Sequence, residues 1–202
     1  MVINWYGEGC FKIQSGETVL MTDRLDESSG LSAPRFKFDV LMSTKMVFPI
    51  EYKNQPEDKI VLGPGEYEVK GIIINGWKVG SNKNELSTVY RVKFEDMTLG
   101  FLGGLKEMPS ASIIEELGGV DILFVPAGGA PYIAQDLAVK LVKQLAPKMV
   151  IGTHFKIPGL KIGVSSPDEF LKEIGQKTEL QEKLTIKKKD FTEKMQVVLL
   201  NP

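Results

Sequence analysis

The sequence predicts one layered α/β or α+β domain with β-sheets inside and helices outside. Short apolar or alternating segments typical of strands fill roughly the first hundred residues, and helical and strand patterns alternate after residue 112. Two further segments of strand type close the chain. The length of 202 residues and the hydrophobic content of 43% fit a single domain over residues 1–202 with a sizeable core.

The first half of the chain is a series of strands joined by turns. Residues 11–14 and 18–22 flank a Ser-Gly dipeptide, which predicts a hairpin with a two-residue turn. Residues 23–38 form a polar loop. Asn75-Gly76 predicts a second hairpin turn, of type I′. The other predicted strands of this half are residues 2–6, 40–42, 59–62, 66–69, 71–74, 77–79, 86–94 and 97–102.

The second half alternates helices and strands. Ser112 and Glu115 predict a capping box for a short helix over residues 113–117. Apolar residues recur every four positions from Ile133 to Leu145, which predicts an amphipathic helix. A third helix is expected to begin at Ser166-Pro167 and to end at Gly175. The predicted strands of this half are residues 121–125, 149–151, 184–187 and 195–200.

Charge and composition exclude several classes of partner. The chain carries 25 Lys and Arg against 26 Asp and Glu, so its net charge of −1 offers no field that would attract nucleic acid or an anionic membrane. No apolar stretch approaches the ~20 residues of a membrane span, and the first residues lack the pattern of a signal peptide. Cys10 is the single cysteine, which suits a reducing compartment. We therefore expect a soluble cytoplasmic protein.

The most informative segment is residues 39–50, where a buried strand leads into an unusually apolar loop. Open α/β sheets place their working loops at such strand ends, yet this loop offers a Lys, a Pro and several apolar side chains. The chain also contains a single histidine, His154. A zinc site needs three or four converging His, Cys or carboxylate ligands, so a His-rich site is excluded by number.

Six segments carry motifs that occur in a fixed order. They are residues 4–11 (Asn-Trp-Tyr-Gly-Glu-Gly-Cys-Phe), 19–24 (Val-Leu-Met-Thr-Asp-Arg), 63–69 (Gly-Pro-Gly-Glu-Tyr-Glu-Val), 100–105 (Gly-Phe-Leu-Gly-Gly-Leu), 120–129 (Val-Asp-Ile-Leu-Phe-Val-Pro-Ala-Gly-Gly) and 147–154 (Pro-Lys-Met-Val-Ile-Gly-Thr-His). Together they resemble the metallo-β-lactamase superfamily, in its small stand-alone branch of metal-dependent hydrolases. The resemblance spans roughly residues 2–175.

This resemblance implies an αββα sandwich of the α+β class, in which two mixed β-sheets pack face to face with helices outside. The active site would lie at one edge, where the strand-end loops meet. In the family, a Ser/Thr-His-x-His-x-Asp-His motif follows the strand at residues 40–42 and holds one or two ions of zinc or another divalent metal. A metal-bound hydroxide then attacks an ester, lactone, thioester or phosphodiester.

The metal-binding motif is replaced in this chain. Thr44 fits the Ser/Thr position, but Lys45 and Val47 fall on the first two His positions. Pro49 falls on the Asp and Ile50 on the last His. Valine and isoleucine carry no donor atom, and we therefore expect no metal cofactor and no hydrolysis by the family mechanism.

Other family positions are replaced as well. Glu8 stands where the opening motif has a His, and Gly104 stands where an Asp usually bridges two metals. The next family His would fall near residues 79–81, which contain none. His154 alone occupies a ligand position, and Asp23 a supporting one.

The candidate vestigial catalytic residues are His154, Asp23, Lys45 and Thr44. His154 is either a residual general base or an inherited residue that is hydrogen-bonded inside a closed pocket. Asp23 either pairs with His154 or Lys45, or caps the loop backbone after its strand. In both cases we favour the structural interpretation.

Two further groups are candidates for binding. Gly104, Gly128, Gly129 and His154 could line a small-ligand cleft, although the two adjacent glycines more simply serve a tight strand-to-helix turn. The apolar residues 46–50 either fill the emptied pocket as core or form an exposed patch for a partner. We expect core filling.

The favoured hypothesis is a catalytically inactive protein with the metallo-β-lactamase fold and a binding or structural role. Its partner would be an unidentified protein or a small ligand, and a homo-oligomer stays an open option. The first alternative is a weak metal-independent hydrolase that uses His154 with Asp23 or Lys45. The second is a module that binds a small ligand in the vestigial cleft.

Overall fold

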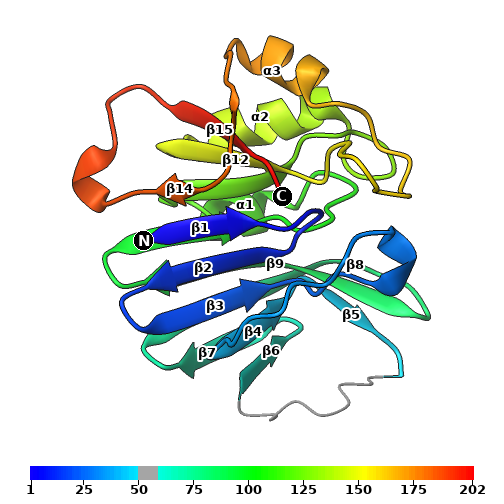
Figure 1. Ribbon diagram of the computed structural model, residues 1–202, viewed down its shortest axis with the longest axis vertical. Coiled ribbons are helices and arrows are strands. Elements are labelled where there is room, and N and C mark those ends of the chain that lie inside the picture. The colour runs from blue at the N-terminus through cyan, green and yellow to red at the C-terminus, as the bar shows by residue number, and fades with distance from the viewer. Residues whose placement is uncertain (50–58) are drawn as a thin grey trace.

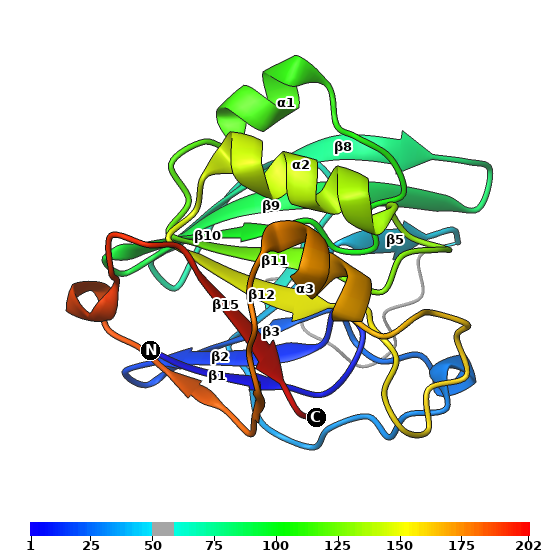
Figure 2. The same cartoon turned by 90° about the horizontal axis from the view of Figure 1, so that it is seen from above.

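The computed structural model describes residues 1–49 and 59–202 of the chain. They form two mixed β-sheets that pack face to face, with α-helices on an outer face (Figures 1 and 2). The α+β sandwich predicted from the sequence is therefore confirmed. Within the described ranges, no helix combines the length and the apolar character that crossing a membrane requires.

The smaller sheet has the strand order β14-β1-β2-β3-β4-β6. The pairs β3–β4 and β4–β6 are parallel and the others antiparallel, so the free ends of β3 and β4 point to the same edge. Its strands are β1 (Val2–Trp5), β2 (Phe11–Ser15), β3 (Thr18–Thr22), β4 (Val40–Ser43), β6 (Ile60–Leu62) and β14 (Leu184–Thr185).

The larger sheet has the order β13-β15-β12-β11-β10-β9-β8-β7, and β5 pairs with the start of β9. Five adjacent strands of this sheet, β10, β11, β12, β15 and β13, run parallel to one another, as is expected where helices connect strands. Its strands are β5 (Lys45–Val47), β7 (Gly65–Val69), β8 (Ile72–Ser81), β9 (Glu85–Phe94), β10 (Met97–Phe101), β11 (Ile122–Pro126), β12 (Met149–Thr153), β13 (Leu180–Gln181) and β15 (Gln196–Leu200).

The α-helices lie on the face of the larger sheet that points away from β1–β3 (Figure 2). They are α1 (Ala111–Glu116), α2 (Gln135–Leu145) and α3 (Asp168–Ile174), and α3 packs against α2. Ser110, two residues before the predicted Ser112, caps α1 by accepting from the backbone N–H of Ile113. Gly175 ends α3 in a left-handed conformation, as predicted.

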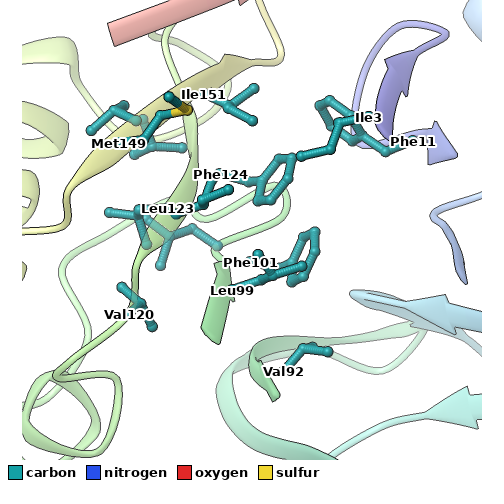
Figure 3. Packing of buried hydrophobic residues seen from close by; sticks show 14 of the residues in the cluster. Ile3, Phe11, Val92, Leu99, Phe101, Val120, Leu123, Phe124, Met149 and Ile151 are labelled. Atoms are coloured by element: carbon teal, nitrogen blue, oxygen red, sulfur yellow. The ribbon is translucent and has the colours of Figure 1, made fainter. Parts of the chain in front are cut away.

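The main core fills the space between the two sheets. Phe124 of β11 stacks on Phe101 of β10 at a centroid distance of 4.4 Å and meets the ring of Phe11 edge-on at 4.8 Å (Figure 3). Strand β2 therefore docks on the centre of the larger sheet. Alternate side chains of β1 to β4 point into this layer and hold the two sheets together. The strand ends of both sheets therefore meet at one edge of the sandwich.

A second apolar cluster covers the opposite face of the smaller sheet. Cys10, Met21 and Leu41 point outward from this sheet and are covered by Tyr6 and by Leu25, Phe36 and Phe38 of the long loop between β3 and β4. In the part of the chain that the structure describes, this loop, and not an α-helix, forms the outer layer there. Its aromatic residues let an irregular segment bury the apolar face that a helix would otherwise cover.

The predicted hairpin turn at Asn75-Gly76 is wrong. Strand β8 runs straight through it, and the turn lies at Lys70-Gly71, where both residues have positive φ angles of 54° and 76°. Gly76 instead packs against Tyr90. A Cβ at this position would lie 2.5 Å from the tyrosine ring. The glycine therefore makes room for a large buried neighbour and does not serve a turn.

Candidate functional site

A pocket of about 790 Å³ opens at one edge of the sandwich, where strand-end loops of both sheets meet. This is the edge at which the sequence resemblance placed the site. Residues that follow strand ends form part of its lining, among them Glu8, Asp23, Thr44, Gly104, Tyr132 and His154. The pocket therefore draws on segments that lie far apart in the sequence.

Asp23 connects the ends of β3 and β4. Its Oδ1 accepts from the backbone N–H of Thr44 at 2.6 Å and its Oδ2 from the hydroxyl of the same residue at 2.7 Å. Ser43 donates a longer bond of 3.4 Å to Oδ1. Burial raises the pKa of Asp23 to about 6 despite these bonds. The aspartate thus caps the connection between β4 and β5.

His154 follows β12 and is buried. Its Nδ1 lies 2.8 Å from Oγ1 of Thr153, and burial lowers the pKa of the imidazole to about 3, so the ring is neutral at pH 7. A Cβ at Gly104 would lie 4.0 Å from Nε2, which places that nitrogen beside the glycine. Among the described residues, no hydrogen bond joins His154 to Asp23 or to Lys45.

Glu8 and Tyr132 form a pair at the floor of the pocket that sequence reasoning missed. The hydroxyl of Tyr132 donates to Oε2 of Glu8 at 2.7 Å, and its ring meets that of His154 edge-on at 4.6 Å. Oε1 of Glu8 is buried and accepts no hydrogen bond from the described residues. Burial raises the pKa of Glu8, while the bond from Tyr132 opposes the rise. The carboxyl group is therefore more readily protonated than an exposed glutamate.

Three of these residues adopt left-handed backbone conformations. The φ angles are 51° at Glu8, 32° at Asp23 and 51° at His154. Residues other than glycine seldom adopt this backbone conformation. Its energetic cost is of order 1–3 kcal/mol per residue, and such residues occur mainly at functional sites. The backbone at each strand end therefore turns sharply and directs the side chain toward the pocket.

Lys45 lies at the rim of the pocket, away from the floor. Its Nζ pairs with Oε2 of Glu85 at 2.8 Å, and Nζ of Lys106 pairs with Oε1 of the same glutamate at 3.2 Å. The bond from Lys45, followed by that from Lys106, holds the pKa of Glu85 below its usual range. In the part of the chain that the structure describes, Lys45 therefore pairs with Glu85, and with neither Asp23 nor His154.

The expected filling of the pocket by residues 46–50 is wrong for Val47 and Phe48. Val47 is 52% exposed and Phe48 43% exposed, and both line the open pocket. The cause is the pairing of β5 with β9, which turns Met46 inward and its two neighbours outward. Ile50, which was expected to continue this filling, lies outside the described residues.

The four residues expected to line a ligand cleft fall into two groups. Gly104 and His154 line the pocket, whereas Gly128 and Gly129 are absent from its described wall. A Cβ at Gly128 would collide with the carbonyl oxygen of His154, so this glycine lets the chain after β11 pass close to the end of β12. Gly129 has a φ of 67° at the turn toward α2. Both glycines therefore serve close packing and a turn.

Comparison with known proteins places this geometry in a family. The family described as "Beta-lactamase superfamily domain" matches residues 2–154, which is well over half of the chain. The chain belongs to the beta-lactamase superfamily. No curated protein matches its sequence.

Solved structures of the beta-lactamase superfamily share the fold. A candidate Zn-dependent hydrolase of the metallo-beta-lactamase superfamily from Thermotoga maritima superposes with a TM-score of 0.80 at 24% identity, over 99% of each chain. Igni18, a metallo hydrolase from Ignicoccus hospitalis, gives 0.66 at 14% identity over 92% of this chain and 99% of its own. The metallo-beta-lactamase fold protein YhfI from Bacillus subtilis gives 0.62 at 12% identity over 98% and 95%. At these identities the likeness establishes the fold alone.

The superfamily implies a divalent metal, and the described residues do not fit one. Within residues 1–49 and 59–202, no three His, Cys, Asp or Glu side chains are grouped so that they could hold a metal ion. Asp23 directs both oxygens to Thr44, and Nδ1 of His154 is engaged by Thr153. Lys45 is held in an ion pair. The donors that remain are too few for a typical tetrahedral or octahedral site.

Proposed function

We propose that this member of the beta-lactamase superfamily is non-catalytic and binds a small organic ligand in the pocket at the strand ends. One observation carries the proposal. The pocket is open at about 790 Å³, within the range of about 300–1,000 Å³ that is typical of small-molecule sites, whereas two polar groups of its floor, Asp23 and Nδ1 of His154, are bound to neighbouring residues. A purely structural role would not require this space.

The proposal has a direct test in metal content. Purified protein is incubated with excess zinc, passed through a desalting column and analysed by mass spectrometry. We expect well below one zinc ion per chain, because neither Lys45 nor Val47 offers a free donor atom. Iron and manganese are tested in the same way. Stoichiometric metal together with hydrolysis of an ester, lactone or phosphodiester would overturn the proposal.

Ligand binding is tested by thermal unfolding across a panel of metabolites. A ligand that binds the native state alone raises the unfolding temperature in proportion to its concentration. The variant Ser87→Phe, which places a ring in the pocket wall, should abolish the shift. Ser112→Phe on the exposed side of α1 is the matched control and should preserve it. Equal shifts in both variants, or none with any ligand, would count against a ligand in this pocket.

The alternative of metal-independent hydrolysis is tested with the same material. Thr44 donates its hydroxyl to Asp23 at 2.7 Å, which is the contact a threonine nucleophile would require of a carboxylate base. Its Oγ1 is also packed against Gly103, which hinders attack on a substrate. We expect no turnover in metal-free buffer. Hydrolysis that disappears in Thr44→Val would establish the alternative.

A further inference from the structure

Two lysines from distant elements converge on one carboxylate at the rim of the pocket. Lys45 belongs to β5 and Lys106 to the segment after β10, and each binds a different oxygen of Glu85, the first residue of β9. All three side chains line the pocket. These three side chains carry two positive charges and one negative charge. Arg24 and Asp26 also line the pocket and add one charge of each sign, so the balance at the rim stays positive by one charge.

These ion pairs are open to exchange with a ligand. The side chains of Lys45 and Lys106 are 59% and 61% exposed, and that of Glu85 is 21% exposed. Exposed pairs of this kind contribute little to stability. Each ammonium also carries three N–H donors and uses one of them on Glu85. With respect to the described residues, both lysines thus retain donors for a second anion.

An apolar surface adjoins the positive rim. Val47 and Phe48 are half-exposed, follow Lys45 closely in the chain and line the same pocket. Exposed apolar side chains that occur next to one another at a pocket rim favour contact with an apolar part of a ligand. The rim therefore combines positive charge with an apolar surface.

The floor of the pocket repels anions, whereas the rim attracts them. Glu8 and Asp23 place two carboxyl groups there, and His154 is neutral. Burial raises the pKa of both acids, because desolvation disfavours their charged forms, and the negative charge of Glu8 adds a smaller rise at Asp23. An anionic group that enters the pocket is therefore most stable beside Lys45 and Lys106.

We propose that the ligand is an amphipathic organic anion, whose charged group binds between Lys45 and Lys106 and whose apolar part lies against Val47 and Phe48. Glu85 is the internal counter-ion that holds the two lysines in place when no ligand is bound. This inference rests on the proposed ligand-binding function and adds the chemical class of the ligand.

The test uses two fluorescent probes with the same rings. Anilinonaphthalene sulfonate is an amphipathic anion, and N-phenylnaphthylamine lacks the sulfonate. Each is titrated into the native protein, and circular dichroism confirms the folded state. We expect one site per chain that binds the sulfonate more tightly than the neutral probe, and added salt should weaken the sulfonate alone.

Three variants identify the residues responsible. Lys45→Gln and Lys106→Gln should each weaken binding of the sulfonate by about five-fold, which corresponds to the loss of one partly exposed ion pair, and should leave binding of the neutral probe within about two-fold. Glu85→Gln should tighten binding of the sulfonate, because it removes the competing carboxylate. Lys140→Gln, on the exposed side of α2, is the control and should change nothing.

The outcomes separate this inference from the proposed function. If Glu85→Gln weakens sulfonate binding, or if the lysine variants affect both probes equally, the role of the lysines is structural and the inference fails. If neither probe binds, it also fails. Equal binding of both probes would leave a ligand pocket without anion preference, so the proposed function would survive. Stoichiometric metal with turnover would overturn the proposed function by its own test.

Discussion

The hydroxyl of Tyr132 donates a hydrogen bond of 2.7 Å to the carboxylate of Glu8, across 124 positions of sequence. The bond joins the loop after β1 in the smaller sheet to the segment between β11 and α2 in the larger one. The other carboxylate oxygen of Glu8 accepts no hydrogen bond from the described residues. The tyrosine is therefore the principal support of a buried acid.

Replacement of the tyrosine by phenylalanine should destabilise the protein. Tyr132→Phe leaves the partly buried carboxyl of Glu8 without its donor, which costs about 1–3 kcal/mol of unfolding free energy. Urea denaturation measures this loss. Tyr6→Phe is the matched control, because the hydroxyl of Tyr6 makes no hydrogen bond with the described residues, and it should change the unfolding free energy by less than about 0.5 kcal/mol. Equal losses in both variants would contradict the pairing.

The contribution of Asp23 to stability should fall as the pH rises from about 4 to about 6, whereas the contribution of His154 rises over the same range, so the effect of Asp23 is measured as a difference from a variant. Burial raises its pKa from 3.8 to about 6 in the folded protein, so the folded state binds the proton more tightly than the unfolded state across this window. The difference in unfolding free energy between wild type and Asp23→Asn should decrease there by at most about 3 kcal/mol. Urea denaturation at several pH values measures it, and a flat or rising difference would contradict the burial of this charge.

His154 should stay neutral in the folded protein over the range in which histidines usually titrate. Burial lowers its pKa from 6.5 to about 3, so its contribution to stability is complete above the unfolded pKa and is lost as the pH falls below it. Because the chain contains one histidine, there is a single Hε1 signal of an imidazole to follow by NMR. The chemical shift should be constant between about pH 8 and 5. A midpoint near 6.5 in the folded protein would show that the ring is exposed.

The close approach of Gly76 to Tyr90 predicts a cost for even the smallest side chain. In Gly76→Ala the new methyl group would overlap the ring of Tyr90, and such overpacking costs about 1–3 kcal/mol. Gly163→Ala is the control, since a Cβ at Gly163 meets nothing within 4 Å. Thermal unfolding of both variants measures the difference. A neutral Gly76→Ala would indicate that the ring moves aside at little cost.

Most of the fold could be predicted from local patterns, because apolar periodicity and capping signals lie within a few residues of one another. The turn prediction at Asn75-Gly76 shows the limit. Asn75-Gly76 has the composition of a hairpin turn, but the need of Tyr90 for space explains its glycine, and Lys70-Gly71 makes the turn. A single sequence does not reveal whether a glycine serves a positive φ or a bulky neighbour on the next strand.

The candidate site was predictable in position but not in its contacts. Asp23, Thr44 and His154 follow strand ends that the sequence brings to one edge, and all three line the pocket. The partners of these residues depend on tertiary structure. Tyr132 follows a strand without any motif of its own, and Glu85 engages Lys45 only because β5 pairs with β9. The exposure of Val47 follows from the same pairing.

The residues that line the pocket extend from Glu8 to Ile162, so its walls comprise segments that lie far apart in the chain. Contacts between such distant segments form late, because closing long loops is entropically costly. A probe bound in the pocket therefore marks the moment at which both sheets have docked. Anilinonaphthalene sulfonate also binds collapsed intermediates, so the signal of the assembled pocket is the difference in fluorescence between wild type and Lys45→Gln. In a stopped-flow refolding experiment this difference should rise with the slowest phase, after the secondary structure has formed.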